Sequence, residues 1–137
     1  MEKPDVKNDP VAYARDVVGR DPLATFLGVS VEEAGNGYAR CSVTVKPEYL
    51  NAMERAHGAI IYAVADQAFA VACNSTGTMA LALTVNISYI AAAGEGERLI
   101  AEATPVNTGR KVSVWSLIVR GAGDRLIASA QGVAYHK

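Results

Sequence analysis

The residues best suited to chemistry lie in one stretch, from Asn51 to Asn74. Asp66 stands in the middle of this stretch, inside a run of apolar and small residues. An ionised carboxylate is costly in such surroundings, and burial raises its pKa. A carboxyl group of this kind could serve as a general base or as a nucleophile. The alternative is an Asp that reaches the surface or caps a neighbouring element.

The pair His57-Gly58 precedes the apolar run and falls where a helix would begin. The first N–H groups of a helix have no partner within the helix, and the helix dipole favours negative charge there. These are the properties that stabilise a developing oxyanion. Asn51 lies just upstream and can donate or accept hydrogen bonds.

The element that must position these groups is one long helix within residues 51–75. Its alanines, its length and the lack of an internal proline favour a helix over a strand. Its apolar residues surround the axis, which predicts a buried helix. Asp66 and Gln67 interrupt the run too strongly for a membrane span, so other elements must wrap it.

The rest of the chain predicts an antiparallel sheet. Asp9-Pro10 favours a helix start and Gly19 its end, and a second short helix is expected from Asp21 to Leu27. Asn36-Gly37 then indicates a hairpin turn. Alternating or strand-forming segments are 29–34, 38–45, 81–89, 98–106, 111–120 and 125–135. One long helix and about five or six antiparallel strands indicate an α+β fold.

Composition excludes several other classes of protein. A chain of 137 residues with half of them hydrophobic predicts one domain. The net charge of −1 offers no basic face for nucleic acid. The two cysteines, Cys41 and Cys73, make no disulfide framework, and with two histidines they show no metal-ligand spacing. The polar opening Met1–Asp5 lacks a signal peptide pattern, so a cytoplasmic location is expected.

The order of residues around the long helix resembles the motif of hotdog-fold acyl-CoA thioesterases. The branch is the one named for the phenylacetic acid degradation thioesterase, with the pattern Asn-x-x-Gly-x-x-His-Gly-Gly, then Ala-Asp and Ala-x-Asn. The matching positions are Asn51, His57, Gly58, Ala65-Asp66 and Ala72-Cys73-Asn74. Two positions depart from it. Glu54 stands at the usual first Gly, where Glu adopts φ > 0 less readily, and Ala59 replaces the last Gly.

The resemblance implies a hotdog fold, in which a sheet curls round the central helix. The resemblance covers roughly residues 20–135. The expected domains are an N-terminal segment with a short helix, residues 1–20, and a hotdog thioesterase domain, residues 21–137. The resemblance also implies hydrolysis of an aryl- or short- to medium-chain acyl-CoA, with Gly58 as oxyanion donor and Asp66 as general base or nucleophile. His57 and Asn51 would orient the loop, the substrate or the water, and Thr84 would help to position the water.

The spacing of the two principal groups adds a constraint of its own. Gly58 and Asp66 are eight residues apart, and a helix rises about 1.5 Å per residue, so they are separated by about 12 Å. One thioester carbonyl cannot touch both groups of one helix. The enzyme interpretation therefore requires at least a homodimer with shared sites. The resemblance implies such dimers, often paired, so a homotetramer is expected.

A second cluster, Gly109, Arg110 and Lys111, lies in a turn before a strand. In the family this region commonly holds the nucleotide, so these residues are predicted to bind the phosphates of coenzyme A. The alternative is an ordinary solvated charge pair. Coenzyme A enters only as part of the substrate, and no separate cofactor, metal, nucleic acid or membrane is expected. Trp115 and Tyr89 are interpreted as packing on a sheet face.

Two other functions remain open at this point. A hotdog hydratase or dehydratase would use a His and an acidic residue at other spacings, which the motif matches less well. A non-catalytic domain that binds or senses acyl-CoA is the other alternative. Asp66 argues against it, because binding alone does not need a buried carboxylate.

Overall fold

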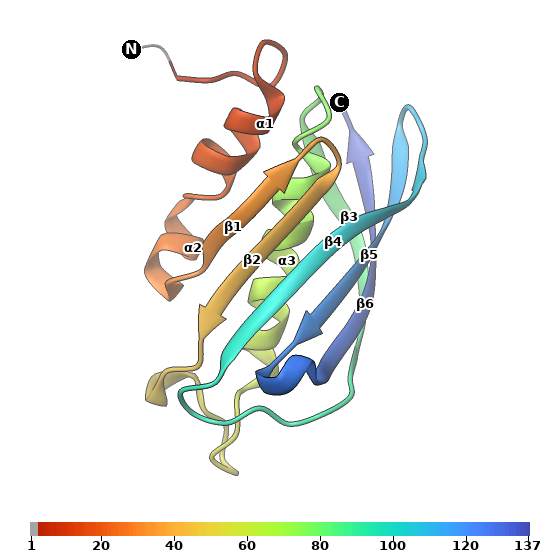
Figure 1. The fold of residues 1–137 in the computed structure, drawn as a ribbon. Coiled ribbons are helices and arrows are strands. Elements are labelled where there is room, and N and C mark those ends of the chain that lie inside the picture. The colour runs from red at the N-terminus through yellow and green to blue at the C-terminus, as the bar shows by residue number, and fades with distance from the viewer. Residues whose placement is uncertain (1–2) are drawn as a thin grey trace.

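A six-stranded antiparallel sheet curves around one long helix, α3 (Gly58–Cys73), in the computed structural model, which describes residues 3–137 (Figure 1). The order across the sheet is β1-β2-β4-β5-β6-β3. The strand bounds are β1 Ser30–Gly35, β2 Tyr38–Thr44, β3 Ala80–Tyr89, β4 Arg98–Thr108, β5 Val112–Arg120 and β6 Leu126–His136. The prediction of an α+β fold, with antiparallel strands before and after one long helix, is confirmed.

Small side chains on the concave face of the sheet let α3 pack closely against it. Ala39, Ala101 and Ala103 from β2 and β4 are fully buried beneath the helix. Gly132 of β6 faces Phe69 so closely that a Cβ atom would lie 2.7 Å from the ring. Trp115 is fully buried in this core, so its predicted packing role is confirmed.

Helix α3 is shorter and less enclosed than the sequence predicts. It begins at Gly58, whereas residues 51–57 form a loop with one 3₁₀ turn, Pro47–Tyr49, ahead of it. The prediction of a helix buried on all sides is wrong, because the sheet covers only part of its circumference. The partly exposed positions form one stripe along the helix: Gly58, Ala59, Tyr62, Ala63, Asp66 and Ala70.

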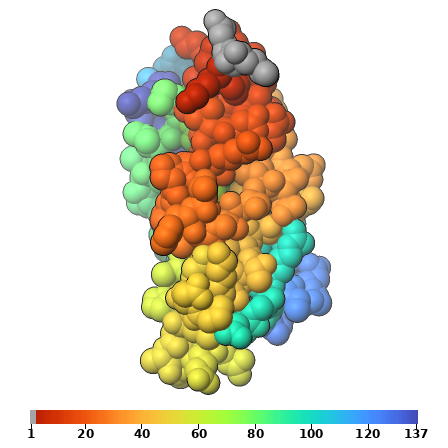
Figure 2. Space-filling model, turned by 90° about the vertical axis from the view of Figure 1, so that its left-hand side faces the viewer, coloured from red at the N-terminus to blue at the C-terminus, as the bar shows by residue number. Residues whose placement is uncertain are grey.

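The N-terminal segment packs beside α3 (Figure 2). It contains α1 (Pro10–Tyr13), a π-helical turn η1 (Ala14–Val18) and α2 (Pro22–Leu27). The predicted Asp-Pro start and Gly19 end are found, but the second half of the first helix is π-helical. Gly19 then lies against Val31 of β1, with no room for a side chain, and Gln67 donates to the Val18 carbonyl at 2.8 Å. This segment therefore shields the β1 edge of the sheet.

The opposite edge of the sheet is open. Among the described residues, β3 pairs with β6 alone. Its Leu81 and Leu83 are 55% and 58% exposed, which is high for leucines in a ten-residue strand. Long apolar strand edges are sites where another strand can pair.

None of the helices within residues 3–137 has the length and apolar character needed to span a membrane.

Candidate active site

The beginning of α3 leaves one backbone donor free. The His57 side chain caps the helix, because its Nδ1 accepts the Ala59 N–H at 3.0 Å. The His57 carbonyl accepts the N–H groups of Ile60 and Ile61 at 3.0 and 3.4 Å. Of the first four N–H groups of the helix, only that of Gly58 has no partner within residues 3–137. A free N–H at the positive end of a helix dipole is suited to hold an oxyanion.

A closed loop holds this helix start in place. The His57 N–H donates to the Tyr49 carbonyl at 2.8 Å, and the Asn51 N–H donates to the Arg55 carbonyl at 2.7 Å. The Asn51 side-chain oxygen accepts the N–H groups of Met53 and Arg55 at 2.9 and 3.1 Å. Asn51 thus organises the loop through its oxygen, and only its amide NH₂ is left to face a substrate or water.

Glu54, at the usual glycine of the motif, adopts the left-handed conformation that glycine favours. Its φ angle is +60°, and its N–H donates to the Asn51 carbonyl at 3.0 Å. The loop therefore has a left-handed residue at this position even though Glu replaces Gly. For a residue with a Cβ atom this conformation costs roughly 1–2 kcal/mol.

This strain predicts that Glu54→Gly stabilises the protein. Removing the Cβ atom relieves the strain, while the added flexibility of the unfolded chain offsets part of the gain, for a net increase of about 0.5–1 kcal/mol in the free energy of unfolding. Glu54→Ala is the matched control, because it removes the same exposed carboxylate but keeps the Cβ atom. Urea denaturation would measure the free energy of unfolding of both variants. Equal values for Glu54→Gly and Glu54→Ala would refute this account.

Asp66 lies on the open stripe of α3, about one turn beyond Tyr62 and about two turns beyond Gly58. Its side chain is half-buried and accepts no hydrogen bond from the described residues. Burial raises the pKa of this carboxyl above its usual value of 3.8, and the negative charge of Asp21 raises it further. The predicted raised pKa is confirmed, and a carboxylate without fixed donors is free to accept a proton from water or to attack a carbonyl.

An apolar pocket of about 280 Å³ adjoins Asp66 between α2 and α3. Leu23 and Leu27 of α2 form one wall, and Ala59 and Tyr62 of α3 form the other. A second pocket of about 290 Å³ shares Leu27 and Ala59 with it and reaches His57. Together the two pockets follow α3 from its N-terminal cap to Asp66.

Two tyrosines, Tyr62 and Tyr89, bring aromatic surface to the same stripe, a position that the sequence did not indicate for them. The Tyr89 ring lies against Gly58, so that a Cβ atom on Gly58 would be 3.3 Å from it. Tyr89 lies at the end of β3 and is 51% exposed, so its ring packs only partly, against the start of α3. Burial raises the pKa of Tyr62, as do the charges of Asp66 and then Tyr89.

The structure does not bring every predicted site residue to this stripe. Thr84 lies opposite Val133 of β6, on the face of the sheet that points away from α3. The turn with Gly109, Arg110 and Lys111 lies beyond the far end of α3, where Gly109 and Arg110 line a pocket of about 280 Å³ with Thr76 and Thr78. Lys111 instead lies over the Tyr135 ring at 6.0 Å.

His136 lines the same far pocket and pairs with a serine, Ser113, that is enclosed behind it. Ser113 Oγ lies 2.6 Å from His136 Nε2, and it accepts the indole N–H of Trp115 at 2.7 Å. Thr78 Oγ1 lies 2.8 Å from His136 Nδ1. Ser113 is only 1% exposed, so it cannot reach a substrate as a nucleophile. Burial lowers the pKa of His136, as expected for a neutral imidazole within a hydrogen-bonded core.

Comparisons with known proteins agree with this fold and this helix. The model of the Thioesterase superfamily matches residues 53–128, which include Gly58 and Asp66. A protein of Archaeoglobus fulgidus, provisionally described as an esterase, is 45% identical over 130 residues, which span 94% of this chain and 84% of that protein. The acyl-coenzyme A thioesterase PaaI of Escherichia coli is 29% identical over 115 residues, 84% of this chain and 82% of PaaI.

Solved structures give the same result. The E. coli PaaI protein from the phenylacetic acid degradation operon superposes with a TM-score of 0.89 at 26% identity, covering 97% of this chain and 96% of PaaI. A variant of the phenylacetic acid degradation protein PaaI from Thermus thermophilus superposes with a TM-score of 0.82 at 32% identity, covering 85% and 100%. The sheet curled round α3 is thus a hotdog fold. The chain belongs to the thioesterase superfamily, and it is a PaaI-like thioester hydrolase.

Proposed function

We propose that this protein hydrolyses acyl-CoA thioesters to the free acid and coenzyme A, at sites shared between two copies of the chain. One observation carries the proposal: the unpartnered Gly58 N–H and the half-buried Asp66 carboxylate lie on the same open stripe of α3. They are separated by about 12 Å along the helix, too far to act on one carbonyl. A second α3 facing the first could supply the missing group of each site.

The open edge of the sheet supports such a dimer. A second copy pairing along β3 would extend the sheet and cover the exposed Leu81 and Leu83. It would also bring a second α3 alongside the stripe that carries Gly58 and Asp66. An interface of this kind is isologous, so one dimer would hold two equivalent sites. Two such dimers would form the homotetramer expected from the resemblance.

The roles of the groups follow from their surroundings. The Gly58 N–H of one chain would polarise the thioester carbonyl and stabilise the negative oxygen that forms on it. Asp66 of the other chain would take a proton from water as the water oxygen attacks the carbonyl carbon, and the thiolate of coenzyme A would leave. Alternatively Asp66 itself would attack, and water would then hydrolyse the anhydride. His57 caps the helix, and Asn51 orders the loop.

The acyl group is the part of the substrate that the apolar pockets would hold. The pocket beside Asp66 measures about 280 Å³ and is walled by Leu23 and Leu27. This size suits compact acyl groups, aryl or short- to medium-chain, better than long chains. The name of the E. coli relative, acyl-coenzyme A thioesterase, supports the same substrate class.

A thiol-release assay on a panel of acyl-CoAs tests this proposal. We expect turnover of aryl- and short- to medium-chain acyl-CoAs, with one thiol released for each acid formed. A domain that only binds acyl-CoA would release no thiol. A hydratase would change the absorbance of an enoyl-CoA and leave its thioester intact. Either of these two results would refute the proposed hydrolysis.

Arg110 and Lys111 are proposed to contact the phosphates of coenzyme A. Arg110 would do so from the wall of the pocket that it lines with Thr76 and Thr78. Replacing both by Ala should raise KM for acyl-CoA by about 10-fold, as expected for the loss of hydrogen bonds to a charged group. The KM for a short acyl thioester that lacks the nucleotide should stay within about 2-fold. Equal changes for both substrates would show that these residues are an ordinary solvated charge pair.

A further inference from the structure

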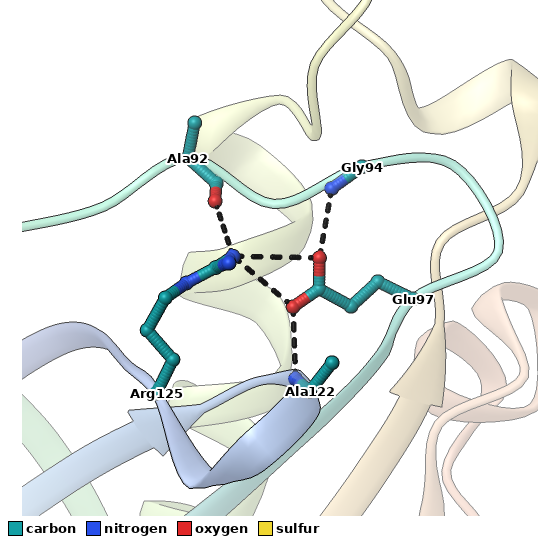
Figure 3. A network of polar contacts seen from close by, with 5 residues as sticks. All are labelled: Ala92, Gly94, Glu97, Ala122 and Arg125. Carbon is teal, nitrogen blue, oxygen red and sulfur yellow. Dashed lines mark hydrogen bonds and ion pairs between the residues drawn. The ribbon is translucent and has the colours of Figure 1, made fainter.

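A partly buried carboxylate joins two turns at the end of the sheet nearest the start of α3 (Figure 3). Glu97 Oε1 accepts the Gly94 N–H at 3.0 Å, and its Oε2 accepts the Ala122 N–H at 2.9 Å. The Arg125 guanidinium lies 3.2 Å from Glu97 Oε2 and donates to the Ala92 carbonyl at 2.6 Å. The Glu97 side chain is only 13% exposed. We call Glu97 and Arg125 the loop clamp.

The contacts of the loop clamp fix the peptide groups on both sides of Ala93. Arg125 donates to the carbonyl of Ala92, just before Ala93, and Glu97 accepts the N–H of Gly94, just after Ala93. Ala93 itself is 1% exposed, and its carbonyl accepts the Ala56 N–H at 2.8 Å. Ala56 is also buried and stands two residues before Gly58. A short path of hydrogen bonds therefore connects the loop clamp to the start of α3.

Electrostatics keeps the loop clamp charged. Burial alone would raise the pKa of Glu97, but the N–H groups of Gly94 and Ala122 and the guanidinium of Arg125 outweigh it and hold the pKa below its usual value. A neutral amide in place of this carboxylate could accept at its oxygen only, and its NH₂ would face an N–H donor or the guanidinium. Glu97→Gln should therefore release one of the two turns.

We infer that Glu97 and Arg125 are positioning residues for thioester hydrolysis, which set the direction of the Gly58 N–H through Ala93 and Ala56. This inference rests on the proposed function of Gly58. The geometry of an oxyanion donor matters strongly, since a misplacement of about 1 Å can cost about 10²-fold in rate. Weakening the loop clamp should cause a smaller misplacement and leave the acyl pockets intact.

Kinetics of Glu97→Gln and Arg125→Lys test this role. Both variants should lower kcat by about 10-fold and leave KM within about 2-fold. Glu33→Gln and Arg40→Lys are the matched controls, because they alter an ion pair of 3.0 Å on β1 and β2, away from the loop, and both should keep the wild-type kcat. In a Gly58→Pro background, which lacks the donor, Glu97→Gln should lower kcat by less than about 2-fold further. A full additional 10-fold loss there would overturn the inference.

Hydrogen exchange at the Ala56 amide gives a test that needs no catalysis. Its exchange should speed up by about 10-fold in Glu97→Gln and Arg125→Lys, and not in the two controls. If wild-type protein releases no thiol from any acyl-CoA, the proposed function fails, but this measurement still decides whether the loop clamp holds the helix start. Unchanged Ala56 exchange in both variants would overturn the inference, whether or not the protein hydrolyses acyl-CoA.

Discussion

Asp66→Asn is expected to lower kcat for acyl-CoA hydrolysis by about 10²–10⁴-fold, the usual contribution of a positioned general base. The Asn side chain has the same shape but can neither take a proton from water nor form an anhydride. Substrate binding and the fold should be preserved, because Asp66 makes no hydrogen bond to the described residues. Initial rates would measure the loss in kcat, and equilibrium binding of a non-hydrolysable acyl-CoA analogue would show that substrate binding is preserved. Near-normal turnover would remove Asp66 from the mechanism.

The raised pKa of Asp66 predicts a pH dependence in the same protein. The base acts in its ionised form, so kcat should rise with pH through a pKa above 3.8, the ordinary value. The folded pKa exceeds the unfolded one, so the ionised group weakens the folded state. Stability is therefore lost as pH rises from the unfolded pKa through the folded pKa. Asp66→Asn should remove this loss and melt at a temperature at or above that of the wild type at neutral pH.

Gly58→Pro is expected to lower kcat by about 10²–10³-fold, because it removes the one N–H of the helix start that has no partner among residues 3–137. Proline is tolerated at the first position of a helix, and the preceding His57 already has an extended backbone with ψ of 141°. The fold should therefore be retained.

Gly58→Ala is the matched control for this variant. Its Cβ atom would also lie 3.3 Å from the Tyr89 ring, but it keeps the N–H. Tyr89 is half exposed and can shift by a few tenths of an ångström. We expect a loss of only a few-fold for Gly58→Ala. Similar losses in the two variants would mean that crowding at Tyr89, and not the donor, limits the rate.

Local patterns made the fold predictable. The Asn36-Gly37 turn joins β1 and β2 as expected, and the alternating segments became the strands because one face of each had to be buried. The Asp-Pro pairs cap both N-terminal helices for the same local reason. The π-helical turn before Gly19 was not predictable, since no pattern in residues 14–18 distinguishes it from an ordinary α-helical turn.

The candidate site was predictable only in part. Gly58, His57 and Asp66 lie on one segment, so their spacing along α3 was predictable, but the open stripe on which Gly58 and Asp66 lie was not, because the apolar pattern predicted burial on all sides. Glu97 and Arg125 were missed because they meet only when β4, β5 and β6 become neighbours in the sheet. No local sequence pattern indicates which strands will be neighbours. The contact of Tyr89 with Gly58 was not predictable, because alternation predicts the face of a strand but not which residue of the helix lies opposite it.

The most direct test of shared sites is a mixture of two inactive chains. One carries Gly58→Pro and lacks the donor, and the other carries Asp66→Asn and lacks the base. Each variant alone should be nearly inactive. After unfolding, mixing in equal amounts and refolding, about half of the dimers should contain one chain of each kind. In such a dimer one site has both native groups and the other has both lesions.

The activity recovered by the refolded mixture separates shared sites from sites built by one chain. Shared sites predict recovery of roughly a quarter of wild-type activity, since one of two sites is intact in about half of the dimers. Native mass spectrometry would confirm the mixed dimers in the same sample. Recovery of that size would establish that Gly58 and Asp66 of different chains form one site. No recovery, with mixed dimers present, would show that each chain builds its own site and would contradict the account.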